Sequence, residues 1–579
     1  TGTAFTDTLD GGDGLDSMDG GQSGDLYLML DAAHHSAAEI SDTGTTGSDE
    51  LRFASSTAAQ TLTVFAADTG LEKITIGTGT AAAPDTTATT ALNINAAAAP
   101  NALAITGNAG TNSLTGTAFA DILTGAAGTD TMDGGQSSDL YLIASSTDHA
   151  AAEISDTGTT GSDELRFSSI TAGQTLTVFA ADTGLETVTI GTGTAAAPVS
   201  TATTALNINA AAAPNGLTIS GNAGANNLTG TAFADILTGA AGTDSMDGGQ
   251  AGDLYLIASS SEHAAAEIKD SGTTGFDELR FASATTAQTL TVFAADTGLE
   301  KITIGTGTAA APDTTATTAL NVNAAAAPNA LVITGNAGTN ALTGTAFTDS
   351  LDGSDGADIY LMLDAAHHSA AEISDTGTTG SDELRFASST AAQTLTVFAA
   401  DTGLEKVTIG TGSAAAPVST ATTALNINAA AAPNALAITG NAGANSLTGT
   451  AFADILIGGG GNDTLIGGGG ADTFRFDTTP NSTTNRDILT NFNPAEGDRI
   501  ELENAVFTAL TTTGSLATGA FVVGSIFTTL DQRILYNPTT GALTYDSNGS
   551  DPTAATLATF ATLPTGLSAQ MSAAQFTVT

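Results

Sequence analysis

Cysteine and tryptophan are absent from this chain of 579 residues, and lysine and arginine together number only 12. Without cysteine the chain can form no disulfide bonds, thiolate metal sites or iron–sulfur clusters. With so few cations it cannot assemble the basic patch on which nucleic-acid binding depends. Its apolar runs fall short of the about 18 residues that a membrane-spanning helix needs. The sequence therefore predicts neither a nucleic-acid partner nor a membrane span.

Acidic residues are abundant by contrast. The chain contains 60 aspartate and glutamate residues and has a formal net charge of −48, which disfavours a compact state by self-repulsion. Two interpretations fit such a chain: intrinsic disorder, or a fold that bound cations complete. Disordered chains have few apolar residues, whereas 41% of these residues are apolar and recur in a pattern. The composition therefore favours the fold completed by cations.

Long internal repeats organise the chain. The phrase Gly-Thr-Ala-Phe-Ala/Thr-Asp begins at Gly2, Gly116, Gly230, Gly344 and Gly449, with spacings of 114, 114, 114 and 105 residues. Such self-similarity indicates a repeat architecture. The predicted segments are four repeats at 1–106, 107–220, 221–334 and 335–439, a fifth block at 440–475, and a C-terminal region at 476–579. Because the first block begins inside a unit, we expect processing or truncation upstream.

The shorter spacing reveals a unit of nine residues. Where the second repeat has two nonapeptides at 125–142, the fourth has only one at 353–361. The unit follows the pattern G-G-x-G-x-D-x-U-x, in which U is a large apolar residue, and its best copies are Gly458–Ile466 and Gly467–Arg475. Consecutive copies form blocks at 2–28, 107–142, 221–256, 335–361 and 440–475.

These blocks resemble the RTX, or haemolysin-type, calcium-binding repeat family. The resemblance implies an all-β fold, a parallel β-roll in which each nonapeptide is half a turn. The six glycine-rich residues then form a turn, and the apolar residue at position eight points into the core. The aspartate at position six would bind Ca²⁺, which takes six to eight oxygen ligands.

Two half-turns make one turn, so the resemblance implies that ligands stack between nonapeptides two apart. Asp349 has no stacked partner in its shortened block, which predicts one ion fewer there, and Asp16 needs a partner that the chain does not contain. Asparagine replaces aspartate in four copies. The predicted metal ligands are Asp7, Asp16, Asp25, Asn112, Asp121, Asp130, Asp139, Asn226, Asp235, Asp244, Asp253, Asn340, Asp349, Asp358, Asn445, Asp454, Asp463 and Asp472.

Short alternating strands recur between the blocks, at 51–53, 62–64, 74–76, 92–94 and 103–105 in the first repeat. Their spacing suggests that they continue the same parallel solenoid as further rungs. Hairpins are the alternative, but the two-residue Asn-Gly or Asp-Gly turns typical of hairpins are missing between them. The Ala-rich segments such as 96–102 predict connecting bends.

Histidines recur at one equivalent place, His34-His35, His149, His263 and His367-His368. A zinc site would need further ligands, and only Glu39 and its equivalents recur nearby, so an exposed loop or short helical turn is the favoured interpretation. Asp49 and Glu50 recur before Leu-Arg-Phe. An ion pair with Arg52 or a second calcium site would explain them, and a solvated strand edge is the interpretation we favour.

The C-terminal region resembles the segment that follows RTX blocks in type I-secreted proteins, in Asp487–Phe492 and Glu496–Ile500. This implies a β-cap with a secretion signal recognised by the type I secretion machinery, and a secreted protein at a bacterial cell surface. No zincin, nucleophile-elbow or phosphate-loop motif is present, so we expect no enzyme. We expect a calcium-dependent structural protein that binds itself, as an S-layer, matrix or filament subunit, with cell-surface polysaccharide as a further partner. The alternatives are the C-terminal part of a large RTX adhesin or ice-binding stalk, or the remnant of an RTX enzyme or toxin.

Overall fold

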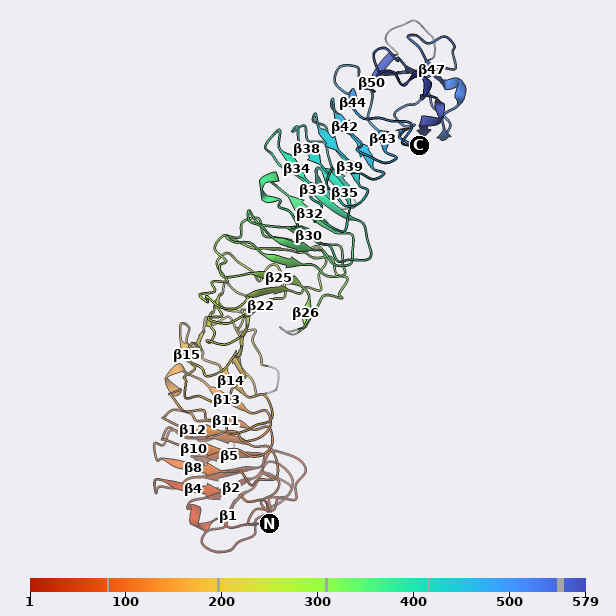
Figure 1. Ribbon diagram of the computed structural model, residues 1–579. Helices are drawn as coiled ribbons and strands as arrows, with labels where there is room; N and C mark the ends of the chain where they lie inside the picture. Colours follow the sequence, from red (N-terminus) through yellow and green to blue (C-terminus); the bar gives the residue numbers. More distant parts are fainter. Residues whose placement is uncertain (81–82, 195–197, 308–310, 414–415, 549–556) are drawn as a thin grey trace. The chain divides into compact units, whose positions relative to one another are not determined.

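The computed structural model describes residues 1–579 except 81–82, 195–197, 308–310, 414–415 and 549–556. The chain divides into two compact units. Unit 1 comprises Thr1–Arg280 and Ala295–Leu299, and unit 2 comprises Phe281–Ala294 and Glu300–Thr579. Both units are built almost entirely of short β-strands, which stack as rungs within each unit (Figure 1).

Unit 1 is a parallel β-roll with strands on two sides. The strands of its longer sheet are β1 (Thr8–Asp10), β2 (Leu26–Met29), β3 (Glu50–Phe53), β5 (Lys73–Ile76), β9 (Ala104–Thr106), β11 (Ile122–Thr124), β13 (Leu140–Ile143), β14 (Glu164–Phe167), β16 (Thr187–Ile190), β18 (Thr218–Ser220), β20 (Ile236–Thr238) and β22 (Leu254–Ile257). The other side has two short sheets, formed by β4 (Gln60–Thr63), β8 (Leu92–Asn95), β10 (Ser113–Thr115) and β12 (Thr131–Asp133), and by β15 (Thr175–Thr177), β17 (Asn207–Asn209), β19 (Asn227–Thr229) and β21 (Ser245–Asp247).

The register confirms that a nonapeptide is half a turn. Within a block, each strand pairs in parallel with the strand 18 residues later, as Ser113 does with Thr131 and Ile122 with Leu140. Successive nonapeptides therefore alternate between the two sides of the roll. Their apolar residues at position eight, such as Leu114 and Leu123, are buried between the sides.

The strands between the blocks continue the same roll, as the sequence predicted. Strand β14 pairs in parallel with β13 before it and with β16 after it, and β16 pairs with β18. Hairpins occur as excursions from the roll, for example β6 (Thr78–Thr80) with β7 (Ala83–Asp85). The predicted bends are present too: in 96–102 the Ala99 N–H donates to the Ala96 carbonyl, at 2.8 Å. The intervening segments are therefore irregular rungs whose loops are longer.

Unit 2 has the same construction. One sheet contains β24 (Thr289–Thr291), β28 (Asn321–Asn323), β30 (Ala341–Thr343), β32 (Ile359–Met362), β33 (Asp382–Phe386), β35 (Leu404–Ile409), β39 (Ala437–Thr439), β41 (Ile455–Ile457), β43 (Thr473–Phe476), β45 (Arg499–Leu502), β51 (Phe576–Val578) and β46 (Gly514–Ser515). The other side has β25 (Lys301–Ile304), β29 (Val332–Thr334) and β31 (Ser350–Asp352), and then β34 (Thr394–Thr396), β38 (Asn426–Asn428), β40 (Ser446–Thr448), β42 (Thr464–Ile466), β44 (Asp487–Leu489), β50 (Leu557–Thr562), β49 (Ala542–Asp546), β48 (Ile534–Tyr536) and β47 (Phe521–Val523).

The nonapeptide missing from the fourth repeat exchanges the two sides of the roll. In unit 1 the Glu-Leu-Arg-Phe strand β14 and the Thr-Leu-Thr strand β15 belong to different sheets. In unit 2 the Thr-Leu-Thr strand β24 of the third repeat shares a sheet with the Glu-Leu-Arg-Phe strand β33 of the fourth. Losing nine residues removes half a turn, so every later strand moves to the opposite side.

The C-terminal region closes the roll, which confirms the predicted β-cap. Strand β45 pairs in parallel with β43, and the terminal strand β51 pairs with β45. On the other side β48, β49 and β50 run antiparallel. The parallel stacking ends here, and side chains such as Phe507 and Phe560 fill the end of the core. The helices of the described residues are short 3₁₀ turns.

Candidate metal centres

The eight ligand pairs expected from the 18-residue spacing are all brought together. In each pair, the backbone N–H of the first residue donates to one side-chain oxygen of the second, at 2.6–3.0 Å. The pairs are Asp7–Asp25, Asn112–Asp130, Asp121–Asp139, Asn226–Asp244, Asp235–Asp253, Asn340–Asp358, Asn445–Asp463 and Asp454–Asp472.

The second aspartate of every pair has one oxygen left over. Among the residues that the structure describes, the Oδ2 atoms of these eight aspartates have no hydrogen-bond partner, although they are buried. A buried carboxylate oxygen without a partner is costly unless a cation compensates its charge. The eight aspartates are Asp25, Asp130, Asp139, Asp244, Asp253, Asp358, Asp463 and Asp472.

Glycine is required where the loops approach one another. Gly468 and Gly470, in the best copy of the repeat, both have a φ of 103°, which lies in the left-handed region that strains other residues. A Cβ on Gly470 would also come within 2.6 Å of the backbone of Phe452, one turn earlier. The glycines thus allow successive loops to stack closely, so that carbonyl and carboxylate oxygens converge.

The first residues of the pairs behave differently from the second. Asp121 uses both oxygens inside the protein, accepting from the N–H groups of Thr117 at 2.5 Å and Leu103 at 2.6 Å. The Asn112 amide donates to the Leu92 carbonyl at 2.7 Å, and the other three asparagines do the same. These side chains close the first loops of each block by hydrogen bonds. Their role as metal ligands stays a prediction.

Four further clusters gather three buried aspartates each, and sequence reasoning recognised one member of each as a ligand. In the second repeat, Asp139 of the block meets Asp156 and Asp163, and their oxygens lie within 4.8 Å of one another. The four triads are Asp25–Asp42–Asp49, Asp139–Asp156–Asp163, Asp253–Asp270–Asp277 and Asp358–Asp375–Asp382. The signal was the recurring Asp-Thr/Ser-Gly-Thr-Thr-Gly-Ser/Phe-Asp, whose spacing differs from that of the nonapeptide.

The triads correct our interpretation of Asp49 and Glu50 as a solvated strand edge, because both side chains are buried. Asp49 accepts the Asp25 N–H at 2.7 Å and so extends the ladder of stacked acids by one turn. Glu50 pairs with Arg52 at 2.6 Å, so the proposed ion pair exists beside the triad. A tyrosine joins each cluster as well, and Tyr27 donates its hydroxyl hydrogen to Asp42.

Burial dominates the electrostatics of these acids. It raises the pKa of Asp139 to about 8, with the neighbouring charges of Asp121 and Asp163 adding to the effect. Burial is also the main reason that the pKa of Asp163 rises to about 7. Each of these buried carboxylates is therefore more stable with a bound proton or a bound cation than as an uncompensated negative charge. The donor set is oxygen only, which fits Ca²⁺ and does not fit soft metals.

The recurring histidines are buried, whereas the sequence predicted an exposed loop or a short helical turn for them. Short helical turns are present, such as η1 (Ala32–His34) and η3 (Ala365–His367), but the recurring histidine is buried and not exposed. His149 Nε2 lies 3.0 Å from Asp182 and its Nδ1 lies 3.2 Å from Glu153. Burial opposes a charge on this ring, but the two carboxylates outweigh it and raise the pKa of His149 to about 9. A protonated imidazole has no lone pair for zinc.

The C-terminal region supplies two further stacked aspartates that we did not predict. Asp487 accepts the Asp463 N–H at 3.1 Å, and Asp498 accepts the Asp472 N–H at 3.0 Å. Burial raises the pKa of Asp487 well above its usual value. Asp487 and Asp498 therefore form one more turn of stacked aspartates after the fifth block. Both lie in the segments that resemble the sequence after RTX blocks.

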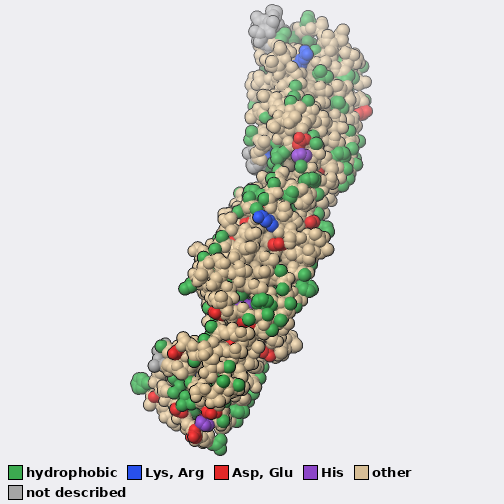
Figure 2. Space-filling view, turned by 90° about the vertical axis from the view of Figure 1, so that its left-hand side faces the viewer, with side chains coloured by type: hydrophobic (Ala, Val, Ile, Leu, Met, Phe, Trp, Pro, Cys, Tyr) green, Lys and Arg blue, Asp and Glu red, His purple; other side chains and the backbone are tan. Residues whose placement is uncertain are grey.

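The acidic residues are thus mainly internal. More than half of the chain's 60 aspartates and glutamates are buried. On the face drawn in Figure 2, acidic side chains form isolated spots and no continuous patch. The charge that would make a disordered chain soluble is here placed inside the roll, where it needs cations.

A parallel roll with glycine corners and inward-facing carboxylates defines a class of calcium-binding β-roll protein. The family model of the RTX calcium-binding nonapeptide repeat matches residues 1–27, 106–141, 220–255, 334–361 and 439–474. The chain thus carries five blocks of the RTX calcium-binding repeat and binds Ca²⁺ through them. Searches of curated proteins and of solved structures find no match. Within the described ranges, no helix is both long and apolar enough to cross a membrane.

Proposed function

We propose that this is an extracellular, non-enzymatic structural protein of a bacterium, which folds around calcium and assembles with copies of itself at the cell surface as an S-layer, matrix or filament subunit. The observation that carries the proposal is that calcium-binding blocks recur five times along the chain, and that rungs of the same kind of roll fill the segments between them. In each unit the rungs of a roll follow one another from strand to strand, and the repeats of 105–114 residues have nearly constant sequence. Stacked repeats of this kind suit a scaffold.

The physical logic couples folding to export. Without a cation, the buried acids oppose the compact state, so the chain stays unfolded where calcium is scarce. Millimolar calcium outside the cell would then drive folding, because a ligand that binds only the folded state stabilises it. In this proposal residues 476–579 address the chain to the type I secretion machinery, and then form the cap of the folded roll.

Electron microscopy of the full chain, with calcium and with a chelator, tests the assembly function. Ordered filaments or sheets that form with calcium and vanish on chelation are the expected result, and added cell-surface polysaccharide would then test for the second partner. Single particles under both conditions contradict self-assembly. They would favour the alternative that these repeats are the stalk of a longer RTX adhesin.

A further inference from the structure

A buried glutamate comes four residues after the recurring buried histidine in each of the four long repeats, outside the segments that the family model matches. These residues are Glu39, Glu153, Glu267 and Glu372, and each is at most 1% exposed. Each comes 23 residues after an aspartate of the preceding block, namely Asp16, Asp130, Asp244 and Asp349. The spacing survives in the fourth repeat, although that block has lost a nonapeptide.

The glutamate and the aspartate lie on successive turns. In the second repeat the Met132 N–H donates to the Glu153 carbonyl at 2.7 Å, and Met132 forms a parallel bridge with Ile154. In the fourth, Leu351 forms the same bridge with Ile373. Our expectation that Asp349 has no stacked partner is therefore wrong, since Glu372 takes that place.

Two carboxylate oxygens in this arrangement are left without partners. Glu153 Oε2 accepts the Ala150 N–H at 2.8 Å and faces His149, whereas its Oε1 has no hydrogen-bond partner in the described part of the chain. Asp130 Oδ1 accepts the Asn112 N–H, and its Oδ2 likewise has none there. The first repeat repeats this pattern in Asp16 Oδ2 and Glu39 Oε1, and the third in Asp244 Oδ2 and Glu267 Oε1.

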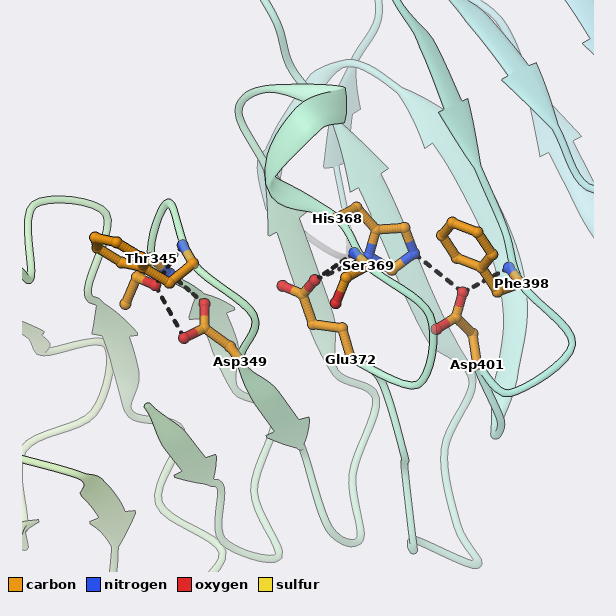
Figure 3. A network of polar contacts seen from close by, with 8 residues as sticks. Thr345, Asp349, His368, Ser369, Glu372, Phe398 and Asp401 are labelled. Carbon is orange, nitrogen blue, oxygen red and sulfur yellow. Dashed lines mark hydrogen bonds and ion pairs between the residues drawn. The ribbon is translucent and has the colours of Figure 1, made fainter. Parts of the chain in front are cut away.

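These oxygens converge on one space. A Cβ on Gly11 would lie 3.0 Å from Asp16 Oδ2 and 3.0 Å from Glu39 Oε1. In the fourth repeat a Cβ on Gly344 would lie 2.5 Å from Asp349 Oδ2, which also accepts the Thr345 N–H, and 3.4 Å from Glu372 Oε1, which has no hydrogen-bond partner in the described residues. Figure 3 shows Glu372 beside Asp349, with one carboxylate oxygen bonded to Ser369 and the other on the side of Asp349. Only glycine leaves this space open.

The side chains around this space carry more negative than positive charge. His149 is the only described basic side chain paired with Glu153, and it also pairs with Asp182. Even with the imidazole charged, His149, Glu153, Asp182 and Asp130 in their ionised forms carry a net charge of −2. We propose that each long repeat binds one further divalent cation, Ca²⁺ by its oxygen ligands, between this aspartate and this glutamate, with the histidine holding the glutamate in place.

Native mass spectrometry of the full chain in calcium tests the proposal, because it counts bound ions one by one. The Glu153→Gln variant keeps the size of the side chain and should bind one ion fewer than the natural chain. The fourfold variant E39Q/E153Q/E267Q/E372Q should bind four fewer. The matched control D10N/D85N/D313N/D531N makes the same change in charge at exposed positions and should lose none.

An unchanged ion count in the folded glutamine variants overturns the proposal, and means that each carboxylate pair shares a proton instead. Circular dichroism in saturating calcium verifies that the variants are folded. If the fourfold variant fails to fold, Glu153→Gln and Glu372→Gln measured separately still decide the question. Ion counting is independent of filament formation, so its outcome is separate from that of the assembly test.

Discussion

Each long repeat neutralises its buried acids in two ways, and the nonapeptide block differs in this from the segment after it. In the block, none of the described lysine, arginine or histidine side chains pairs with Asp130 or Asp139. In the following segment, Arg166 pairs with Glu164 at 2.6 Å and His149 lies between Glu153 and Asp182. Regular glycine corners leave room for ions, whereas longer and irregular loops carry cations of their own.

Calcium removal should produce the largest effect, because it takes the cations from the blocks and leaves the built-in pairs. We expect chelation to unfold the chain, since stacked acids such as Asp139 and Asp163 then repel one another. Far-ultraviolet circular dichroism during titration with a chelator measures this loss. A spectrum that does not change on chelation would show that the blocks need no ions.

Acidification should partly replace calcium in the chelated protein. Burial raises the pKa of Asp139 and of Asp358 to about 8, so the folded state binds these protons more tightly than the unfolded state. The destabilisation is therefore full above about pH 8 and is relieved as the pH falls toward 4. The raised pKa of His149 acts in the same direction, because its stabilising charge is present below about pH 6.5 and lost as the pH rises through about 9.

Far-ultraviolet circular dichroism of the chelated chain at pH 5, 7 and 9 checks this expectation. The folded fraction should be largest at pH 5 and should fall as the pH rises. Thermal melts in saturating calcium should depend little on pH between 7 and 9, because bound ions replace the protons. A chelated protein that is most stable at pH 9 would contradict the burial of these acids.

Breaking an ion pair between two of the protein's own side chains should destabilise the fold less than the loss of all calcium ions. Added calcium should not restore that stability. Arg385 pairs with the buried Glu383 at 2.6 Å, so Arg385→Met leaves a buried charge without its partner. We expect a loss of about 3–5 kcal/mol in the free energy of unfolding, measured by urea denaturation in saturating calcium. The double variant Arg385→Met/Glu383→Gln is the control and should recover much of that loss. Equal destabilisation of both variants would mean that the ion pair is not the cause.

The smallest effect is expected from a single triad. Asp163→Asn removes one charge from the Asp139–Asp156–Asp163 cluster and keeps the shape of the side chain. Calcium affinity depends on the number of charged ligands, so binding at this one cluster should weaken by about tenfold or more. Calorimetric titration of calcium resolves the weakened site, and the exposed change Asp85→Asn serves as the control. Identical titrations would remove the triad from the list of sites.

The blocks could be predicted because their period is strict. Once the resemblance to RTX repeats makes nine residues half a turn, this period places Asp121 below Asp139 and Leu123 in the core. The same arithmetic fails after the block, where the next partner of Asp139 is Asp163, 24 residues on. Loops of unequal length break the period there, so Asp156, Asp163 and Glu153 could not be assigned to a turn, and the burial of His149 was missed.

The sequence by itself determined the nine-residue repeat and the need for cations, because glycine, aspartate and one apolar residue recur at fixed offsets in a chain with few basic residues, and its resemblance to RTX repeats implied the parallel stacking. Tertiary structure alone decided which acids meet outside the blocks and which basic side chains they keep. It also decided that the strands of the fourth repeat change sides, although the missing nine residues are plain in the sequence. The physical reason is that two residues stack when they lie one turn apart. The number of residues in a turn is constant in the blocks but varies with loop length in the segments between them.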